Sequence, residues 1–237
     1  MTLTAAPSRR TATGPPATLW TLLAIGSALA PTGATARPAH SIGPYLMTSE
    51  QQEISLARSA APPSISGHAS VMVLGAHGYV TAVRGSNGFV CLVVRSWDRS
   101  VATQPTGFWN PRFRAPFCLN AAAAQSVLPP YLSRTQWVLA GASRKAIAER
   151  AKGAWAEGKF AEPTPGALCY MMSRRGTWSK GGPWRPHVMF YVPYGQPSSW
   201  GANLQGVPIF AQAGAHTTTF FVLVPFWSDG TPAPRRK

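Results

Sequence analysis

The sequence predicts an α+β domain with a mostly antiparallel sheet, and three features of the 237-residue chain lead to this class. Apolar runs rich in valine, phenylalanine and threonine cluster at residues 70–97 and again at residues 166–227. A segment with helical periodicity, residues 120–158, separates the two clusters. Strands grouped on either side of a helical block are typical of α+β domains.

The first cluster contains three apolar runs, at residues 70–75, 79–85 and 88–97. Short connections that contain or border glycine join them, so we expect a three-stranded antiparallel meander. A helix is expected just before the meander, because Thr48 or Ser49 is a suitable N-cap for the segment that follows it.

The helical block carries its own start signals. Asn120 and Ser143 are suitable N-caps, and the two prolines at 129 and 130 are compatible with a first helical turn. Four further strands are expected after the block, at residues 166–173, 187–193, 207–211 and 216–227.

The beginning of the chain has the three parts of an export signal. Arg9 and Arg10 form a positive region, residues 17–30 are apolar but too short to span a bilayer, and "ATA" at 34–36 fits a small-x-small cleavage site. We therefore expect a periplasmic or secreted protein whose mature N-terminus is Arg37. A short membrane anchor or a chance apolar run is the alternative to a signal, and the twin-arginine route is the alternative to the general secretory route.

The expected organisation is a signal peptide at 1–36, an irregular leader at 37–47, one domain at 48–231 and a loose tail at 232–237. Loss of the two signal arginines would lower the formal net charge from +15 to +13. A basic surface attracts anionic partners. Because the basic residues are scattered along the chain, we expect weak association with anionic envelope components and no specific nucleic-acid binding.

The three cysteines allow one disulfide and leave one free thiol. In an oxidising compartment cysteines tend to pair, and a bridge from Cys91 to Cys118 would hold the long loop between them. We therefore predict a Cys91–Cys118 disulfide, with another pairing or no bridge as alternatives. Cys169, within an apolar run, is predicted to be a buried packing residue.

Several chemistries have no signature in this chain. No cofactor or metal site is predicted, since CxxC, HExxH and phosphate-binding glycine motifs do not occur and the five histidines have no ligand spacing. The seven acidic residues are too few and too scattered to favour a two-carboxylate glycosidase. Whether the protein is an enzyme stays open, with binding favoured over catalysis.

The candidate site is the segment at 181–206, which combines aromatic and polar residues on one strand and its glycine-rich flanks. Such a mixture is typical of small-molecule pockets, so we predict that it binds a small ligand. His187 follows Pro186 and is expected to face a cleft. The alternatives are aromatics that only plug the end of the sheet, a hydrolase with His187 as general base, and a basic surface protein. The predicted ligand-binding residues are Trp184, Arg185, His187, Tyr191, Trp200 and Asn203, with Tyr194 beside them.

Five short segments, "NGFVCLV", "CLNAAAAQSVLP", "PHVMFYVP", "WGANLQG" and "WSDGT", lie along one mature domain. In these segments the chain resembles an exported bacterial protein family without an assigned activity. The resemblance covers most of residues 48–231. It implies export and no particular mechanism.

Overall fold

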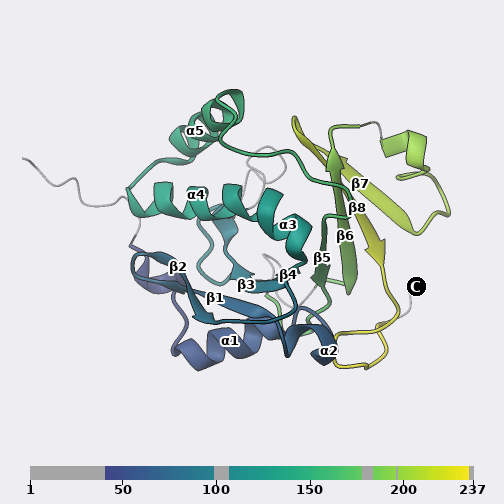
Figure 1. Ribbon diagram of the computed structural model, residues 1–237, viewed down its shortest axis with the longest axis horizontal. Coiled ribbons are helices and arrows are strands. Elements are labelled where there is room, and N and C mark those ends of the chain that lie inside the picture. Colours follow the sequence, from purple (N-terminus) through teal and green to yellow (C-terminus); the bar gives the residue numbers. More distant parts are fainter. Residues whose placement is uncertain (1–40, 99–106, 178–183, 196, 235–237) are drawn as a thin grey trace, which may run out of the picture. The chain divides into compact units, whose positions relative to one another are not determined.

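The computed structural model describes residues 41–98, 107–177, 184–195 and 197–234. In these residues an eight-stranded sheet with helices on both faces confirms the α+β class (Figure 1). The strand order is β2-β1-β3-β4-β5-β6-β8-β7, and every pair is antiparallel except β1 with β3. None of the described helices has the length and apolarity needed to cross a membrane. The strands are β1 (Ser70–Gly75), β2 (Gly78–Val83), β3 (Val90–Val94), β4 (Ala115–Leu119), β5 (Leu168–Met171), β6 (His187–Pro193), β7 (Ile209–Ala213) and β8 (Thr217–Leu223).

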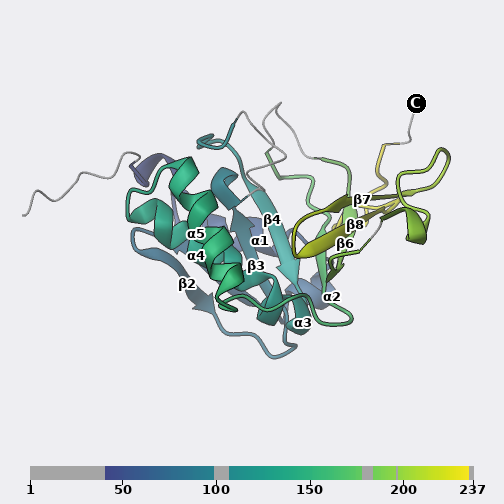
Figure 2. The ribbon, with the colours of Figure 1, turned by 90° about the horizontal axis from the view of Figure 1, so that it is seen from above.

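The helices cover the sheet unevenly. Helices α1 and α2 pack on one face, and α3 and α4 pack on the other with α5 beside α4 (Figure 1). Seen from above, α4 and α5 lie over the half of the sheet that contains β2 and β3, and β6, β7 and β8 extend beyond them (Figure 2). The helices are α1 (Glu50–Arg58), α2 (Pro63–Ser66), α3 (Ala121–Ser126), α4 (Leu128–Leu139) and α5 (Arg144–Ala156), with 3-10 turns η1 (Gly43–Tyr45), η2 (Ser96–Asp98) and η3 (Pro197–Trp200).

Three helix starts confirm the predicted caps. The side chains of Ser49, Asn120 and Ser143 each accept a hydrogen bond from the backbone N–H three residues later, at 3.2, 3.0 and 3.2 Å. Each oxygen satisfies a donor that the first helical turn would otherwise leave unpaired. The two prolines open α4 as expected, because the first turn needs no N–H donor there.

The predicted antiparallel meander is wrong, because β3 pairs with β1 in parallel rather than with β2. The connection at 84–89 crosses the start of β1, where Ser70 donates its backbone N–H to the carbonyl of Phe89 at 2.9 Å. A Cβ at Gly85 would lie 2.2 Å from the backbone nitrogen of Ser70. The backbones can cross this closely because residue 85 has no side chain.

A buried ion pair joins the end of β3 to α1. Nη2 of Arg95 lies 2.9 Å from each carboxylate oxygen of Glu53, and the two side chains are 0% and 2% exposed. Nε of Arg95 donates to the carbonyl of Tyr45 at 3.0 Å, and Glu53 Oε1 accepts the backbone N–H of Leu74 at 3.1 Å. Nη1 of Arg95 donates to the carbonyl of Val93. Four segments, η1, α1, β1 and β3, therefore meet at one charged contact.

The last predicted residues of the β3 run form a turn instead of strand. The backbone N–H of Arg95 donates to Asp98 Oδ2 at 3.0 Å, and the N–H of Asp98 donates back to the carbonyl of Arg95 at 3.1 Å. This reciprocal pair ends β3 at Val94 and starts η2.

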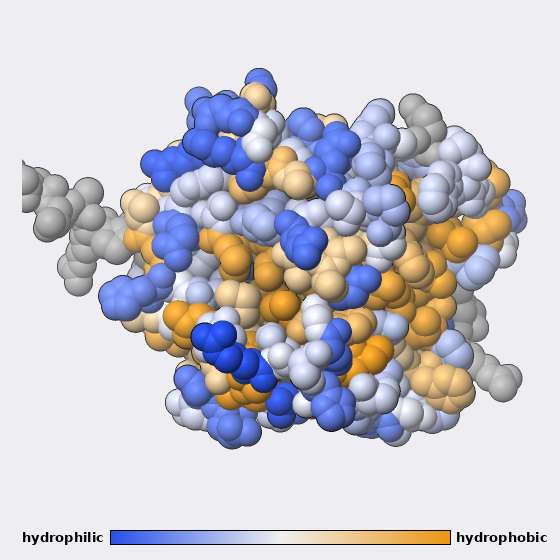
Figure 3. Space-filling view, in the orientation of Figure 1, coloured by the Kyte–Doolittle hydropathy of each residue, from blue (hydrophilic) through white to orange (hydrophobic). Residues whose placement is uncertain are grey.

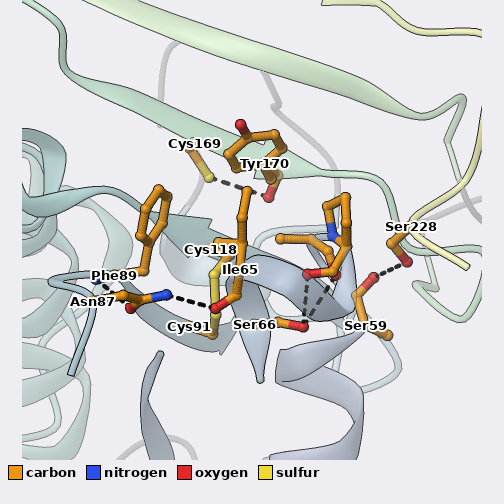
Figure 4. The surroundings of a disulfide bond; sticks show 12 residues. Ser59, Ile65, Ser66, Asn87, Phe89, Cys91, Cys118, Cys169, Tyr170 and Ser228 are labelled. Carbon is orange, nitrogen blue, oxygen red and sulfur yellow. Dashed lines mark hydrogen bonds between the residues drawn. A yellow bond between two sulfur atoms is a disulfide. The ribbon is translucent and has the colours of Figure 1, made fainter. Parts of the chain in front are cut away.

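The predicted disulfide is present, and Cys91 faces Cys118 directly across the β3–β4 pair (Figure 4). Cys169 is a free, fully buried thiol, as expected. It pairs with Leu119, one residue beyond Cys118, so alternation along β4 places its side chain on the opposite face of the sheet. Burial also raises the pKa of the Cys169 thiol, which therefore stays protonated and unreactive.

Glu53→Gln should lower the free energy of unfolding by about 3–5 kcal/mol, because it leaves the Arg95 guanidinium buried without a counter-charge. Urea unfolding followed by far-UV circular dichroism measures this loss. The matched control is Glu157→Gln, which removes the partner of Lys159 from an ion pair that is more than half exposed on both sides. The control should change stability by less than about 0.5 kcal/mol. Equal losses in the two variants would contradict the role given to the buried pair.

Candidate functional site

Strand β6 carries the predicted site, and its alternation sends side chains to both faces of the sheet. His187, Met189 and Tyr191 are buried on the face that α3 and α4 cover. Phe190 lies on the other face, opposite Phe220 in the β6–β8 register. The residues of one contiguous sequence segment therefore do not share one side of the sheet.

A small cavity lies where β4 and β5 separate. The two strands pair near their Cys118–Tyr170 contact and meet again at the Arg114–Thr177 bridge, so residues 115–117 face the longer segment 171–176. The space between them is about 10 Å³, which is room for about one water molecule. Its lining residues are Pro116, Met171, Ser173, Gly176, Trp184 and His187. The cavity is therefore too small for the small organic ligand that we expected.

His187 is 1% exposed, so it lies inside the protein rather than in an open cleft. Its Nδ1 lies 2.7 Å from the carbonyl of Arg185, which places the ring proton on Nδ1 as the donor. Nε2 has no hydrogen-bond partner among the described residues. Burial lowers the pKa of His187 to about 4, so the ring is neutral at pH 7. Among the described residues no acid or nucleophile lies within hydrogen-bond distance of Nε2, although Ser173 lines the same cavity.

Trp184 covers His187 from the side. The centroids of their rings lie 4.5 Å apart, and Trp184 also makes edge contacts with Phe210 and Phe221 at 5.3 and 5.8 Å. Arg185 turns away, and its Nη2 donates to the carbonyl of Pro234 at 3.0 Å. These contacts hold Trp184 against β6, β7 and β8 beside the cavity, and the Arg185 bond ties the C-terminal segment to residue 185.

Tyr191 belongs to the main core. It is 4% exposed, and its hydroxyl lies 3.7 Å from the sulfur of Met189. Burial raises the pKa of Tyr191 well above its usual value. The Tyr191 side chain therefore packs in the main core and does not line the cavity beside His187.

Trp200 and Asn203 lie on the opposite face from Trp184, on the loop between β6 and β7. The ring of Trp200 stacks on Phe220 with centroids 4.6 Å apart. The side-chain amide of Asn203 bonds to the backbone of Ala211 in β7. Nδ2 of Asn203 donates to the Ala211 carbonyl at 3.0 Å, and Oδ1 of Asn203 accepts the Ala211 N–H at 2.9 Å. The backbone N–H of Asn203 also donates to Ile209 at 3.2 Å. Asn203 thus acts as an extra strand partner along the outer edge of β7, with both of its side-chain polar atoms bonded to Ala211.

Backbone conformation explains why asparagine stands at this position. Asn203 has φ of 65°, the only positive φ of a non-glycine residue among the described residues. Asparagine tolerates this left-handed conformation better than most residues, and its short amide can mimic a peptide group. Because exposed strand edges invite pairing with other chains, this contact protects β7.

The sequence analysis predicted a pocket in this region and did not predict the exposed apolar surface that the structure has there. No Asp, Glu, Lys or Arg stands between Arg185 and Asp229, and we call residues 186–228 the uncharged lobe. Within it Tyr194, Trp200 and Leu204 are 58%, 61% and 56% exposed. In Figure 3 apolar residues are visible on this side of the molecule and also over the centre of the same face. The absence of charged residues from 186–228 can be read in the sequence, and it is the signal from which this surface could have been predicted.

A second polar cluster surrounds Asp98, which is buried beside α4. Arg134 donates to the Asp98 carbonyl at 2.8 Å, and Trp97 donates its indole N–H to Thr135 at 3.0 Å. Burial raises the pKa of Asp98 to about 7, and the backbone N–H of Arg95 opposes that rise. These contacts tie the end of β3 to α4 and stabilise the fold.

The described residues contain no group of three or more His, Cys, Asp or Glu side chains placed to hold a metal ion. Comparison of the chain with protein-family models, with curated proteins and with solved structures gave no match in any of the three.

His187 should make the protein sensitive to mild acid. Its pKa is lowered by folding, so the unfolded state takes up the proton first, and stability is lost as pH falls from about 6.5 to about 4. The loss is about 3 kcal/mol relative to His187→Asn, which can keep a donor toward Arg185 but does not titrate. Urea unfolding of both proteins at several pH values measures it. Asp98 has the opposite effect, because its pKa is raised by folding and protonation therefore adds stability as pH falls below about 7. Both proteins contain Asp98, so its contribution cancels when their pH profiles are compared. Parallel pH profiles would contradict this account of His187.

Asn203→Gly should expose the outer edge of β7 without backbone strain, because glycine adopts a positive φ freely. The amide of Ala211 should then exchange with solvent roughly tenfold faster, since a hydrogen bond is worth about 1 kcal/mol. Hydrogen exchange read by NMR measures the rate, with the amide of Val73 in β1 as an internal control. Unchanged protection of Ala211 would show that Asn203 does not guard the edge.

Proposed function

We propose that this chain is an exported binding protein that contacts its partner through the exposed apolar side chains of the uncharged lobe. The observation that carries the proposal is the exposure of Tyr194, Trp200 and Leu204 within a stretch of the chain that has no charged residue. Soluble proteins rarely leave such side chains together in water unless the surface has a partner. Aromatic side chains are also the residues that dominate binding energy at interfaces.

Export is supported by the Cys91–Cys118 disulfide, since such bonds persist in oxidising compartments. The basic, apolar and cleavage-site pattern at the beginning of the chain agrees with it, although residues 1–36 lie outside the described residues. The Sec and twin-arginine routes are both compatible with this proposal.

Binding at a surface fits the geometry better than binding in a pocket. The cavity beside His187 has room for about one water molecule, whereas ligand pockets are far larger. The hydrolase alternative needs an acid or nucleophile beside His187. Within the described residues its Nδ1 contacts a backbone carbonyl and its Nε2 has no partner.

The test is retention on the envelope fraction of the producing cells. Tyr194→Ser combined with Leu204→Ser should lower the retained fraction about tenfold, because two apolar contacts are lost. Both side chains are largely exposed, so the melting temperature should change little. The matched control is Val80→Ser on the edge strand β2, where a side chain 52% exposed is made polar at the other end of the sheet. Equal retention of the wild type and both variants would overturn the proposal.

A further inference from the structure

We propose that the partner of the uncharged lobe is the surface of an anionic phospholipid bilayer, into which Tyr194, Trp200 and Leu204 insert. This inference rests on the proposed function and names the partner class for the same surface. Three features of the lobe carry it: its side chains, its backbone hydrogen bonds and the charge of the rest of the chain.

The side chains suit the interfacial region of a bilayer. Tryptophan and tyrosine concentrate at that depth because their rings are amphipathic, and leucine adds an aliphatic contact. The loop between β6 and β7 presents all three exposed side chains, and it projects from the sheet on the side away from α4 and α5 (Figures 1 and 2). No charged side chain of residues 186–228 would have to be transferred with them.

Several backbone groups of the loop are hydrogen-bonded within the protein before any partner arrives. Thr218 is fully buried, and its hydroxyl both accepts the N–H of Gly195 at 3.1 Å and donates to the Gly195 carbonyl at 3.0 Å. The N–H groups of Gly201 and Ala202 donate to carbonyls within the η3 turn at 3.0 and 3.2 Å. The side-chain amide of Asn203 is hydrogen-bonded to Ala211 of β7. Unpaired polar groups make entry into an apolar medium costly, so internal pairing favours insertion.

The same pairing argues against a glycan as the partner. A polysaccharide site uses amide groups to bind hydroxyls beside an aromatic ring, and Asn203 is the amide nearest in sequence to Trp200 among the described residues of the loop. Both of its polar atoms already bond to Ala211. The large side chains that the loop exposes are Tyr194, Trp200 and Leu204.

The rest of the chain supplies electrostatic attraction. All 22 Lys and Arg and all 7 Asp and Glu residues lie outside residues 186–228, so the chain divides into a basic part and an apolar part. Each basic residue near an anionic membrane contributes about 1 kcal/mol, and apolar insertion adds a second, salt-resistant contribution. Stable membrane association generally needs two such signals.

The experiment places an environment-sensitive fluorophore on Ser198→Cys in the full chain. Cys91 and Cys118 are paired and Cys169 is fully buried, so the new cysteine is the accessible thiol. The matched control carries the label on Thr81→Cys, an exposed position on β2. Because the label reports its own surroundings, the reading is specific to the lobe even if the apolar segment 17–30 also binds lipid.

Vesicles of equimolar phosphatidylglycerol and phosphatidylcholine should raise the emission of the Ser198 label several-fold and shift it to the blue. The Thr81 label should not change, and vesicles of phosphatidylcholine alone should give a weaker response. Adding Leu204→Glu should lower the apparent affinity for the anionic vesicles about tenfold, because it brings a carboxylate to the bilayer.

The outcomes separate this inference from the proposed function. If the Ser198 label does not respond while Tyr194→Ser with Leu204→Ser still loses envelope retention, the partner is a protein or a glycan and the membrane inference is overturned. If both labels respond equally, insertion by the loop is overturned. If the label is silent and the double variant is retained like the wild type, the proposed function falls as well.

Discussion

The arrangement of the first half of the sheet depends on the buried ion pair between Arg95 and Glu53. This pair draws η1, α1, β1 and β3 to one point and leaves neither charge in contact with solvent. Buried ion pairs add little net stability compared with apolar packing, since the desolvation of two charges offsets their attraction. Their geometry is demanding, however, because each donor and acceptor needs its own partner. This contact therefore fixes how α1 lies on the parallel β1–β3 pair, while the disulfide one strand further along fixes β3 to β4.

Local signals in the sequence predicted local structure well. The N-caps Ser49, Asn120 and Ser143 were predictable because a cap interacts with residues only three positions away. The Cys91–Cys118 pair was predictable because only three pairings exist and one of them closes the long loop. The strand order was not predictable in the same way. Short glycine-bordered connections suit both a hairpin and a crossover, and the close passage of Gly85 over Ser70 decides between them in three dimensions.

The candidate site was predicted in part. The segment around β6 does hold the exposed aromatics, but Trp184 and Trp200 were expected to line one pocket and instead contact opposite faces of the sheet. Alternation along β6 and the return of the loop over Phe220 separate them, and neither can be read from spacing alone. Asn203 was predicted to bind a ligand because it is one of the polar residues among the aromatics of the 181–206 segment. Its positive φ and its two bonds to Ala211 show a structural use of the same side chain.

The absence of charge in residues 186–228 also affects the chain before it folds. Charged gatekeeper residues normally flank strongly apolar strands and oppose self-association of unfolded chains. The run at 217–227 is β-branched and aromatic and has no such neighbour until Asp229. In the native sheet β8 lies between β6 and β7, so its backbone is paired on both sides. Formation of these last pairings therefore competes directly with association between chains. The native position of β8 removes the aggregation hazard only once the sheet is complete.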